Sequence, residues 1–227
     1  MPDEQNITHS YIIDYIRSSL SPSTGILSEL ESYARAHEVP IVQKEVAHFL
    51  EIICRIHKPL HVLEIGTAIG YSAILMARKL PETAQITTIE RDARCASFAR
   101  NAIERSGFSD RITVLEGDAQ MLLEVLDGPY DMIFMDAAKA HYIYFLPECI
   151  RLLHPGALLV ADNVLYGGMV ANRQLLIRRK ITIVKRLKKF VSAICTDRRL
   201  ESTILSIGDG VSLSYRLADE SVLGNEG

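Results

Sequence analysis

Short apolar runs alternate with helix-length segments along most of this chain from residue 60 onward. Stretches of about 20 residues separate five runs that have the length of buried strands: HVLEI (61–65), QITTIE (85–90), RITVLE (111–116), DMIFMD (131–136) and ALLVAD (157–162). This alternation is typical of a parallel sheet with helices on both faces. Two further runs, STILSIG (202–208) and VSLSYRL (211–217), meet at the turn GDG and predict a C-terminal antiparallel hairpin.

The residues before the first strand have a helical pattern. Segments 11–20, 25–38 and 42–56 carry apolar residues spaced three and four apart. We expect one domain over 1–227, consisting of a helical N-terminal lead-in (1–57), an α/β core (58–217) and a disordered tail (218–227). No run approaches the ~20 apolar residues of a membrane helix, and the start lacks a signal-peptide pattern. We therefore expect a cytoplasmic protein that does not contact a membrane.

Glycines and acids follow the strands, at the sheet edge where ligands of parallel sheets bind. Gly66 and Gly70 flank the turn after the first strand, which would let backbone amides face a ligand. Their spacing does not match the dinucleotide fingerprint G-x-G-x-x-G. Glu90 ends the second strand, where a carboxylate can accept both hydroxyl hydrogens of a ribose. This pattern favours an adenosine-containing cofactor over a simple tight turn.

The third strand is followed by Gly117 and Asp118, and either of two roles suits Asp118. Its carboxylate could accept a hydrogen bond from an adenine amino group, or it could cap the helix that begins near Ala119. Together with Glu64 and Glu90 it makes the cleft acidic, which would repel a pyrophosphate. A neutral or positive cofactor is therefore expected, and S-adenosylmethionine has that charge.

Asp136 and Asp162 end the next two strands, and Asn163 follows directly. Carboxylate and amide oxygens are the ligands that hard cations such as Mg2+ prefer. Helix caps or turns would explain each residue alone, but two adjacent carboxylates without a cation would repel each other. Lys139 lies three residues after Asp136, and a nearby divalent cation would favour its neutral amine, a general base. A solvated surface lysine is the alternative.

With these residues assembled, the chain resembles the cation-dependent O-methyltransferases, the family of catechol and caffeoyl-coenzyme A methyltransferases. The resemblance spans most of 40–216 and rests on VLEIGTAIGYSA (62–73), TTIERD (87–92), FMDAAKAHY (134–142) and LVADNVLYGG (159–168). Within that family, PIV (40–42), DNVLYGGMV (162–170) and the basic segment after it are similar to bacterial tRNA 5-hydroxyuridine methyltransferases.

The resemblance implies a Rossmann-like class I methyltransferase fold, a homodimer and a set of site residues. The residues implied to surround S-adenosylmethionine are Val42, Glu64, Gly66, Ser72, Glu90, Asp118, Ala119 and Asp136. The implied Mg2+ ligands are Asp136, Asp162 and Asn163, with Lys139 as the catalytic base. The chain departs from the catechol enzymes at Ala137 and Ala138, where those enzymes have an aromatic residue before the lysine. This departure leaves room for a larger acceptor.

Residues 164–195 contain no acid but eight cations, in a chain whose net charge is −3. The segment RQLLIRRKITIVKRLKKF (173–190) could be a packed helix with a solvated basic face, or it could contact RNA phosphates. Tyr142, Tyr144 and Tyr166 could stack on a base, or they could be packing residues. We therefore expect methylation of 5-hydroxyuridine in tRNA, with a small catechol-like or caffeoyl-CoA-like acceptor as the alternative. A noncatalytic nucleotide-binding protein would not explain the metal and lysine pattern.

Overall fold

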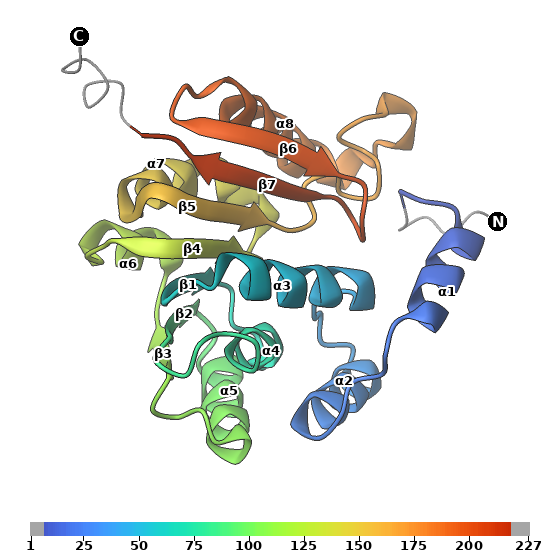
Figure 1. The fold of residues 1–227 in the computed structure, drawn as a ribbon. Coiled ribbons are helices and arrows are strands. Elements are labelled where there is room, and N and C mark those ends of the chain that lie inside the picture. The colour runs from blue at the N-terminus through green and yellow to red at the C-terminus, as the bar shows by residue number, and fades with distance from the viewer. Residues whose placement is uncertain (1–6, 219–227) are drawn as a thin grey trace, which may run out of the picture.

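A single seven-stranded sheet organises the chain (Figure 1), and the computed structural model describes residues 7–218. The strands are β1 (His61–Ile65), β2 (Gln85–Glu90), β3 (Ile112–Glu116), β4 (Tyr130–Met135), β5 (Leu153–Ala161), β6 (Leu200–Leu205) and β7 (Val211–Arg216). Their order across the sheet is β3-β2-β1-β4-β5-β7-β6. Strands β1 to β5 pair in parallel, whereas β7 is antiparallel to both β5 and β6. The expected fold class is therefore confirmed.

Helices cover both faces of the sheet. They are α1 (Ser10–Ser19), α2 (Ile26–His37), α3 (Lys44–His57), α4 (Tyr71–Ala77), α5 (Ala93–Ser106), α6 (Ala119–Val125), α7 (Tyr142–Leu152) and α8 (Ile181–Thr196). In Figure 1, α3, α4 and α5 lie in front of the sheet, and α6, α7 and α8 lie behind it. The helical lead-in is thus observed as α1, α2 and α3. Among the described residues, no helix is long and apolar enough to cross a membrane.

The central strands β1, β4 and β5 are mostly apolar because both faces of the sheet are buried there. Successive side chains of a strand point to opposite faces. Val62 accordingly joins the core under α2 to α5, whereas its neighbour Leu63 joins the core under α6 to α8. Each face has its own hydrophobic core, and the sheet between them is held rigidly. The loops at its carboxyl edge therefore begin from fixed positions.

The order of the strands reverses between β1 and β4. The connections from β1 to β3 lead one way across the sheet, and β4 and β5 lie on the other side of β1. A crevice forms at such a switch point, beyond the carboxyl ends of the strands. In Figure 1 the carboxyl ends of β4 and β5 point toward the side where α1 lies.

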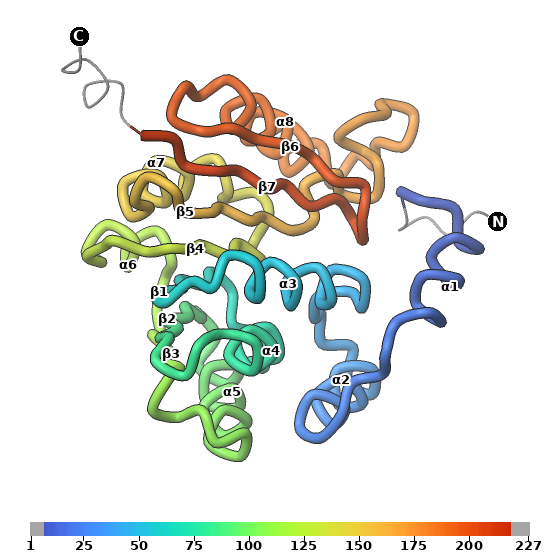
Figure 2. The backbone as a smooth tube through the Cα atoms, viewed as in Figure 1, coloured from blue at the N-terminus to red at the C-terminus, as the bar shows by residue number. Residues whose placement is uncertain are grey.

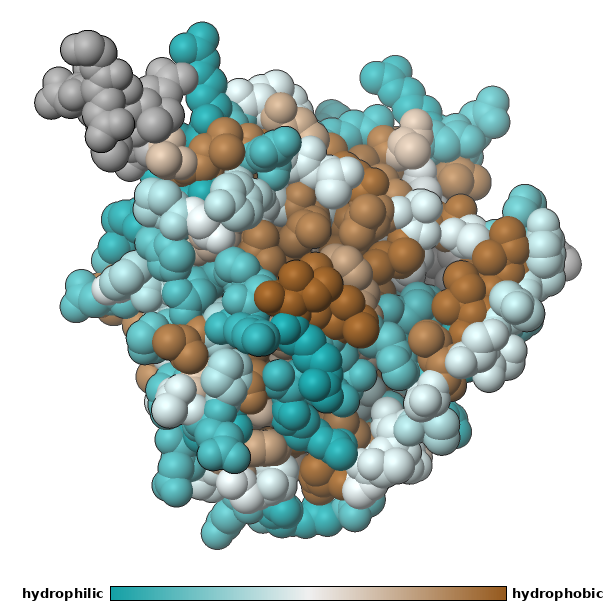
Figure 3. Space-filling view, viewed as in Figure 1, coloured by the Kyte–Doolittle hydropathy of each residue, from teal (hydrophilic) through white to brown (hydrophobic). Residues whose placement is uncertain are grey.

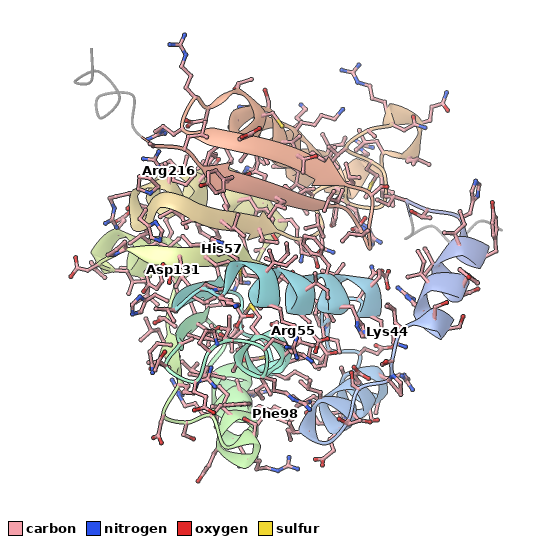
Figure 4. All side chains as sticks on the ribbon, viewed as in Figure 1. Lys44, Arg55, His57, Phe98, Asp131 and Arg216 are labelled. Carbon is pink, nitrogen blue, oxygen red and sulfur yellow. The ribbon has the colours of Figure 1, made fainter. Side chains whose placement is uncertain are left out.

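The opposite, amino edge of the sheet is closed by the carboxylate of Asp131. It accepts hydrogen bonds from the amides of Leu60 (2.6 Å) and His61 (2.7 Å) and pairs with His154 (2.8 Å). His57 at the end of α3 contacts the Asp131 carbonyl at 3.0 Å, and Figure 4 shows the two residues together. These contacts join β1, β4 and β5 where no ligand is expected.

The basic segment is less helical than its apolar spacing suggests. Two short 3₁₀ turns, Arg173–Leu175 and Arg178–Lys180, precede α8, which begins only at Ile181. The first half of the segment is therefore a loop, which lies on the carboxyl-end side of β5 in the tube of Figure 2. The tail expected at 218–227 lies outside the described residues except for Ala218.

Candidate active site

A cleft of about 290 Å³ lies at the carboxyl ends of β1, β2 and β4. Seven of the residues expected around a cofactor line it together: Val42, Gly66, Ser72, Glu90, Asp118, Ala119 and Asp136. Val42 precedes α3, Gly66 follows β1, Ser72 lies in α4, Glu90 ends β2, Asp118 and Ala119 follow β3, and Asp136 follows β4. Residues far apart in the sequence thus meet in one cavity, which we call the first cleft.

The loop after β1 is held against β2 and β4. The amides of Gly66 and Thr67 both donate to the carbonyl of Ile89, at 3.0 and 3.1 Å. Gly66 has a φ of +107°, and a Cβ at this position would lie 2.2 Å from the carbonyl oxygen of Asp136. Only glycine therefore lets the ends of β1 and β4 approach this closely.

Glu90 is fixed before any ligand binds. One carboxylate oxygen accepts the amide of Ala68 and the other accepts the amide of Asp92, both at 2.9 Å. Each oxygen keeps further acceptor capacity on the cleft side. The carboxylate is thus oriented for a ligand that has two adjacent hydroxyl groups.

Glu64 differs from the other expected cofactor residues because it does not line the first cleft. Its side chain is fully buried under the cleft floor, where Thr88 donates a hydrogen bond to Oε2 at 2.5 Å. Within the described part of the chain, no group hydrogen-bonds Oε1. Burial raises the pKa of Glu64 to about 7, against the effect of hydrogen bonds from Ser72 and Thr88. Glu64 can therefore act on a ligand only through neighbours such as Ser72, which does line the cleft.

The sequence patterns had left two roles open for Asp118, and one of them is observed. Asp118 caps α6, because its side chain accepts the amide of Gln120 at 2.9 Å. Its position on the cleft wall is compatible with the second role as well. His141 and Phe145 also line the cleft, with rings stacked 5.9 Å apart, and no sequence pattern singled them out. Only their spacing of four residues, which places two side chains on one face of a helix, would have indicated them.

A second cleft of about 630 Å³ opens beside the first. It is lined by Asp162, Asn163, Tyr166 and Asp209, and by the basic loop from Gln174 to Lys180. The two clefts share four lining residues: Pro40, Ile41, Asp136 and Lys139. A group in the first cleft and a group in the second would therefore meet at Asp136 and Lys139.

The carboxylates of Asp136 and Asp162 follow neighbouring strands in register. Met135 of β4 pairs with Ala161 of β5, and the amide of Asp162 donates to the Met135 carbonyl at 3.0 Å. Asn163 has a φ of +58°, a left-handed conformation that asparagine tolerates, so the chain turns sharply after Asp162. Burial, followed by repulsion from Asp136, raises the pKa of Asp162. The pair would be stabilised by a bound cation.

Tyr142 ties these two strand ends together from below. Its hydroxyl lies 3.1 Å from the carbonyl oxygens of both Met135 and Asp162, and its ring packs edge-on against Phe190 of α8. The side chain is completely buried. Of the two roles left open for Tyr142, packing is the one observed, because its side chain is buried and its hydroxyl binds backbone carbonyls.

Lys139 forms an ion pair with one member of the carboxylate pair, Asp136. Its Nζ lies 3.0 Å from Oδ1 of Asp136, and both side chains are partly exposed to the shared part of the two clefts. The residue begins the 3₁₀ turn Lys139–His141 that leads into α7. The expected base is thus next to the expected metal ligands.

The basic segment lies beside the second cleft, and Arg179, Lys180 and Tyr166 line it. Among the described residues, none of the eight cations between 173 and 189 forms an ion pair. Lys180 lies over the ring of Tyr166 at 4.8 Å, and Arg186 lies over the ring of Tyr144 at 5.1 Å. We call residues 173–180 the cationic rim. It combines positive charge that is not held in ion pairs with the ring of Tyr166 beneath Lys180.

The mixed sheet with its C-terminal antiparallel hairpin is the fold of the Rossmann-like class I methyltransferases. The model of the O-methyltransferase family matches residues 18–217. A catechol O-methyltransferase from Niastella koreensis is 31% identical over 202 residues, which cover 87% of each chain. A caffeoyl-CoA O-methyltransferase from Populus kitakamiensis is 29% identical over 186 residues, with 78% of each chain covered.

Solved structures agree with these sequence relatives. An O-methyltransferase from Bacillus cereus in complex with SAH has a TM-score of 0.81 and 28% identity, covering 95% of this chain and 100% of that chain. The chain belongs to the O-methyltransferase family. It is therefore an enzyme that transfers a methyl group to oxygen.

The buried Glu64 should make the ligand-free protein sensitive to pH. Because its pKa is raised from its usual value to about 7, folding favours the protonated acid. Its contribution to stability is complete at low pH and is lost as the pH rises to 7. Relative to Glu64→Gln, the free energy of unfolding should fall by about 1.4 kcal/mol for each pH unit between 5 and 7 and then level off.

Urea denaturation of both proteins at several pH values would measure this difference. A constant difference between wild type and Glu64→Gln over this range would show that Glu64 is already ionised in the folded state.

Proposed function

We propose that this enzyme uses S-adenosylmethionine and Mg2+ to methylate the ring hydroxyl of 5-hydroxyuridine in tRNA, giving 5-methoxyuridine. The observation that carries this proposal is the cationic rim. It lies beside the second cleft, which shares Asp136 and Lys139 with the first cleft.

The first cleft fits S-adenosylmethionine by its chemistry. Glu90 would accept the ribose hydroxyls, because its carboxylate is already oriented by two backbone amides. The stacked rings of His141 and Phe145, with Ala119, offer an apolar wall for adenine, and Asp118 offers an acceptor for its amino group. The acidic floor suits a sulfonium cation better than a pyrophosphate. When bound, this cofactor supplies the electrophilic methyl group.

The group formed by Asp136, Asp162 and Asn163 fits Mg2+. All three offer oxygen ligands, and the two carboxylates need a countercharge because Asp162 is buried. When bound there, Mg2+ supplies the charge that lowers the pKa of an acceptor hydroxyl and holds two adjacent oxygens. Tyr142 would keep the two carboxylates at their separation by holding the strand ends.

Lys139 is the residue proposed to remove the proton from the acceptor hydroxyl. Its Nζ lies where the two clefts meet and is held at 3.0 Å by Asp136. A ligand that engages Asp136 would release Lys139 from this ion pair, so that its amine can accept the hydroxyl proton. The deprotonated oxygen can then bond to the methyl carbon as the carbon–sulfur bond breaks.

The cationic rim favours a large anionic acceptor. RNA presents phosphates to unpaired arginines and lysines and presents bases that can stack on tyrosines. Tyr166, beneath Lys180, lines the second cleft where an extruded base would enter. In 5-hydroxyuridine the hydroxyl and the neighbouring carbonyl form the vicinal oxygen pair that the metal residues require.

A small catechol-like or caffeoyl-CoA-like acceptor is the second candidate. The sequence relatives include enzymes named for both classes. The phosphates of coenzyme A could also use the cationic rim, whereas a free catechol would leave it without a role. The two candidates therefore differ in how strongly activity should depend on the rim.

A methyl-transfer assay with labelled S-adenosylmethionine tests the proposed acceptor. The protein would be supplied with Mg2+ and, in parallel, hydroxyuridine-bearing tRNA, catechol or caffeoyl-CoA. We expect label in the tRNA, and no transfer when a chelator is added. Arg179→Glu should lower kcat/KM for tRNA severalfold, because Arg179 is an exposed residue that lines the second cleft.

Arg198→Glu is the matched control, because Arg198 is exposed just before β6, at the amino edge of the sheet. It should leave tRNA methylation unchanged. Label found only in catechol or caffeoyl-CoA would overturn the tRNA assignment. Full tRNA methylation in the presence of chelator would overturn the role of the metal.

We also propose that the protein is a homodimer. Figure 3 shows an apolar area over α3 and the strands beside it. Ile52 and Ile56 of α3 are 54% and 73% exposed, and Tyr215 of β7 is 45% exposed. Contiguous apolar surface of this kind marks interaction sites on soluble proteins. A second copy would cover the same residues on both subunits through a two-fold axis.

Sedimentation of Ile56→Glu at micromolar concentration tests the dimer. A buried charge at a self-complementary interface is repeated in both subunits, so the variant should sediment as a monomer. Val125→Glu is the control, because Val125 is equally exposed on α6 and outside the apolar area. A monomeric wild type, or a dimeric Ile56→Glu, would contradict the proposal.

A further inference from the structure

Asp209 is the third carboxylate of the second cleft. It is neither one of the proposed metal ligands nor the proposed base. It lies between Gly208 and Gly210 in the turn that joins β6 to β7 and lines the cleft together with Asp136 and Asp162. The sequence pattern had indicated only a hairpin turn here. An acid in the wall of an acceptor cleft raises the question of what it binds.

The turn is packed too tightly to move away from the cleft. A Cβ at Gly208 would lie 2.6 Å from Val46 of α3, and one at Gly210 would lie 2.5 Å from Leu165. The amides of Val164 and Leu165 donate to the carbonyls of Gly210 and Asp209, at 2.9 and 3.1 Å. The turn and the loop after β5 are therefore one rigid unit, and Asp209 is fixed within it.

Only one oxygen of the Asp209 carboxylate is used by the protein. Oδ1 accepts the amide of Gly167, which fixes the turn after Tyr166. In the described part of the chain, no hydrogen bond to Oδ2 is found, and the carboxylate feels the positive charges of Lys139 and Lys180. A partly buried carboxylate oxygen without a donor is costly unless a ligand or water supplies one. The second oxygen is therefore available to the acceptor.

We propose that Asp209 accepts a hydrogen bond from the acceptor and selects acceptors that carry a donor beside their vicinal oxygen pair. This inference rests on the proposed acceptor cleft. The imide N–H of hydroxyuridine is such a donor, since it adjoins the carbonyl of the vicinal pair. Catechol has only a C–H at the corresponding position, whereas pyrogallol has a third hydroxyl. Asp209 thus discriminates between acceptors that have the same vicinal oxygen pair but differ in the group beside it.

Two matched pairs of acceptors test this role. One pair is an anticodon stem-loop with 5-hydroxyuridine and the same RNA methylated on the imide nitrogen. The other pair is pyrogallol and catechol. In each pair that wild type methylates, kcat/KM should be about tenfold or more higher for the member with the donor. This is the effect of one hydrogen bond to a charged group.

Asp209→Asn is the informative variant. Its amide oxygen can still accept the Gly167 N–H, while its NH2 group faces the cleft without acceptor capacity. The preference within each pair should fall to less than about threefold, and the affinity for S-adenosylhomocysteine and the melting temperature should stay unchanged. Asp209→Ala should lose the preference too, and it should also slow all acceptors because the loop after Tyr166 is released.

An undiminished preference in Asp209→Asn would overturn the proposal. Equal losses for both members of a pair would do the same, because they would show that Asp209 only positions the loop. If the enzyme methylates phenols but not hydroxyuridine, the tRNA function fails, and the pyrogallol and catechol pair still decides the role of Asp209.

Discussion

The pairing of β4 with β5 at their carboxyl ends is the constraint on which the site depends. Because Met135 lies opposite Ala161, the next residue of each strand is an aspartate, and the two carboxylates become neighbours. The buried hydroxyl of Tyr142 binds the carbonyls of both strand ends. A slip of one residue in this register would turn one carboxylate to the other face of the sheet and separate the pair.

This arrangement stores unfavourable electrostatics in the ligand-free protein. Asp162 is buried beside Asp136, and Glu64 is buried nearby under the first cleft. The enzyme thus holds acidic side chains where water is scarce and ionisation is disfavoured, and among the described residues only Lys139 forms an ion pair with one of them, Asp136. Such a site gains stability from cationic ligands, and a sulfonium cofactor and a divalent metal are both cationic. The buried acids that destabilise the protein without ligands are therefore also the groups that favour binding of cationic ligands.

Much of this site could be predicted from sequence, because acids and glycines directly follow apolar runs of strand length. Parallel pairing brings the ends of such runs to one edge, which is why Gly66, Glu90, Asp136 and Asp162 meet as expected. The resemblance to a known family added Val42 and Ser72, which no local pattern singles out.

Other features depend on packing between distant segments, which local patterns do not encode. The sequence places Glu64 near the end of the first strand. Only the fold shows that its side chain lies beneath the cleft rather than in its wall. The buried position of Tyr142 required knowledge of where α8 packs. The sequence around Asp209 is that of an ordinary hairpin turn. Only the fold shows that this turn packs against the loop after β5.

The central claim is that a methyl donor in the first cleft and a metal-held acceptor in the second meet at Asp136 and Lys139. A crystal structure with S-adenosylhomocysteine and Mn2+, using the anomalous signal of manganese, tests it most directly. The account predicts S-adenosylhomocysteine in the first cleft and one strong manganese peak bounded by Asp136, Asp162 and Asn163. Manganese bound elsewhere, with those three residues free of metal, would contradict it.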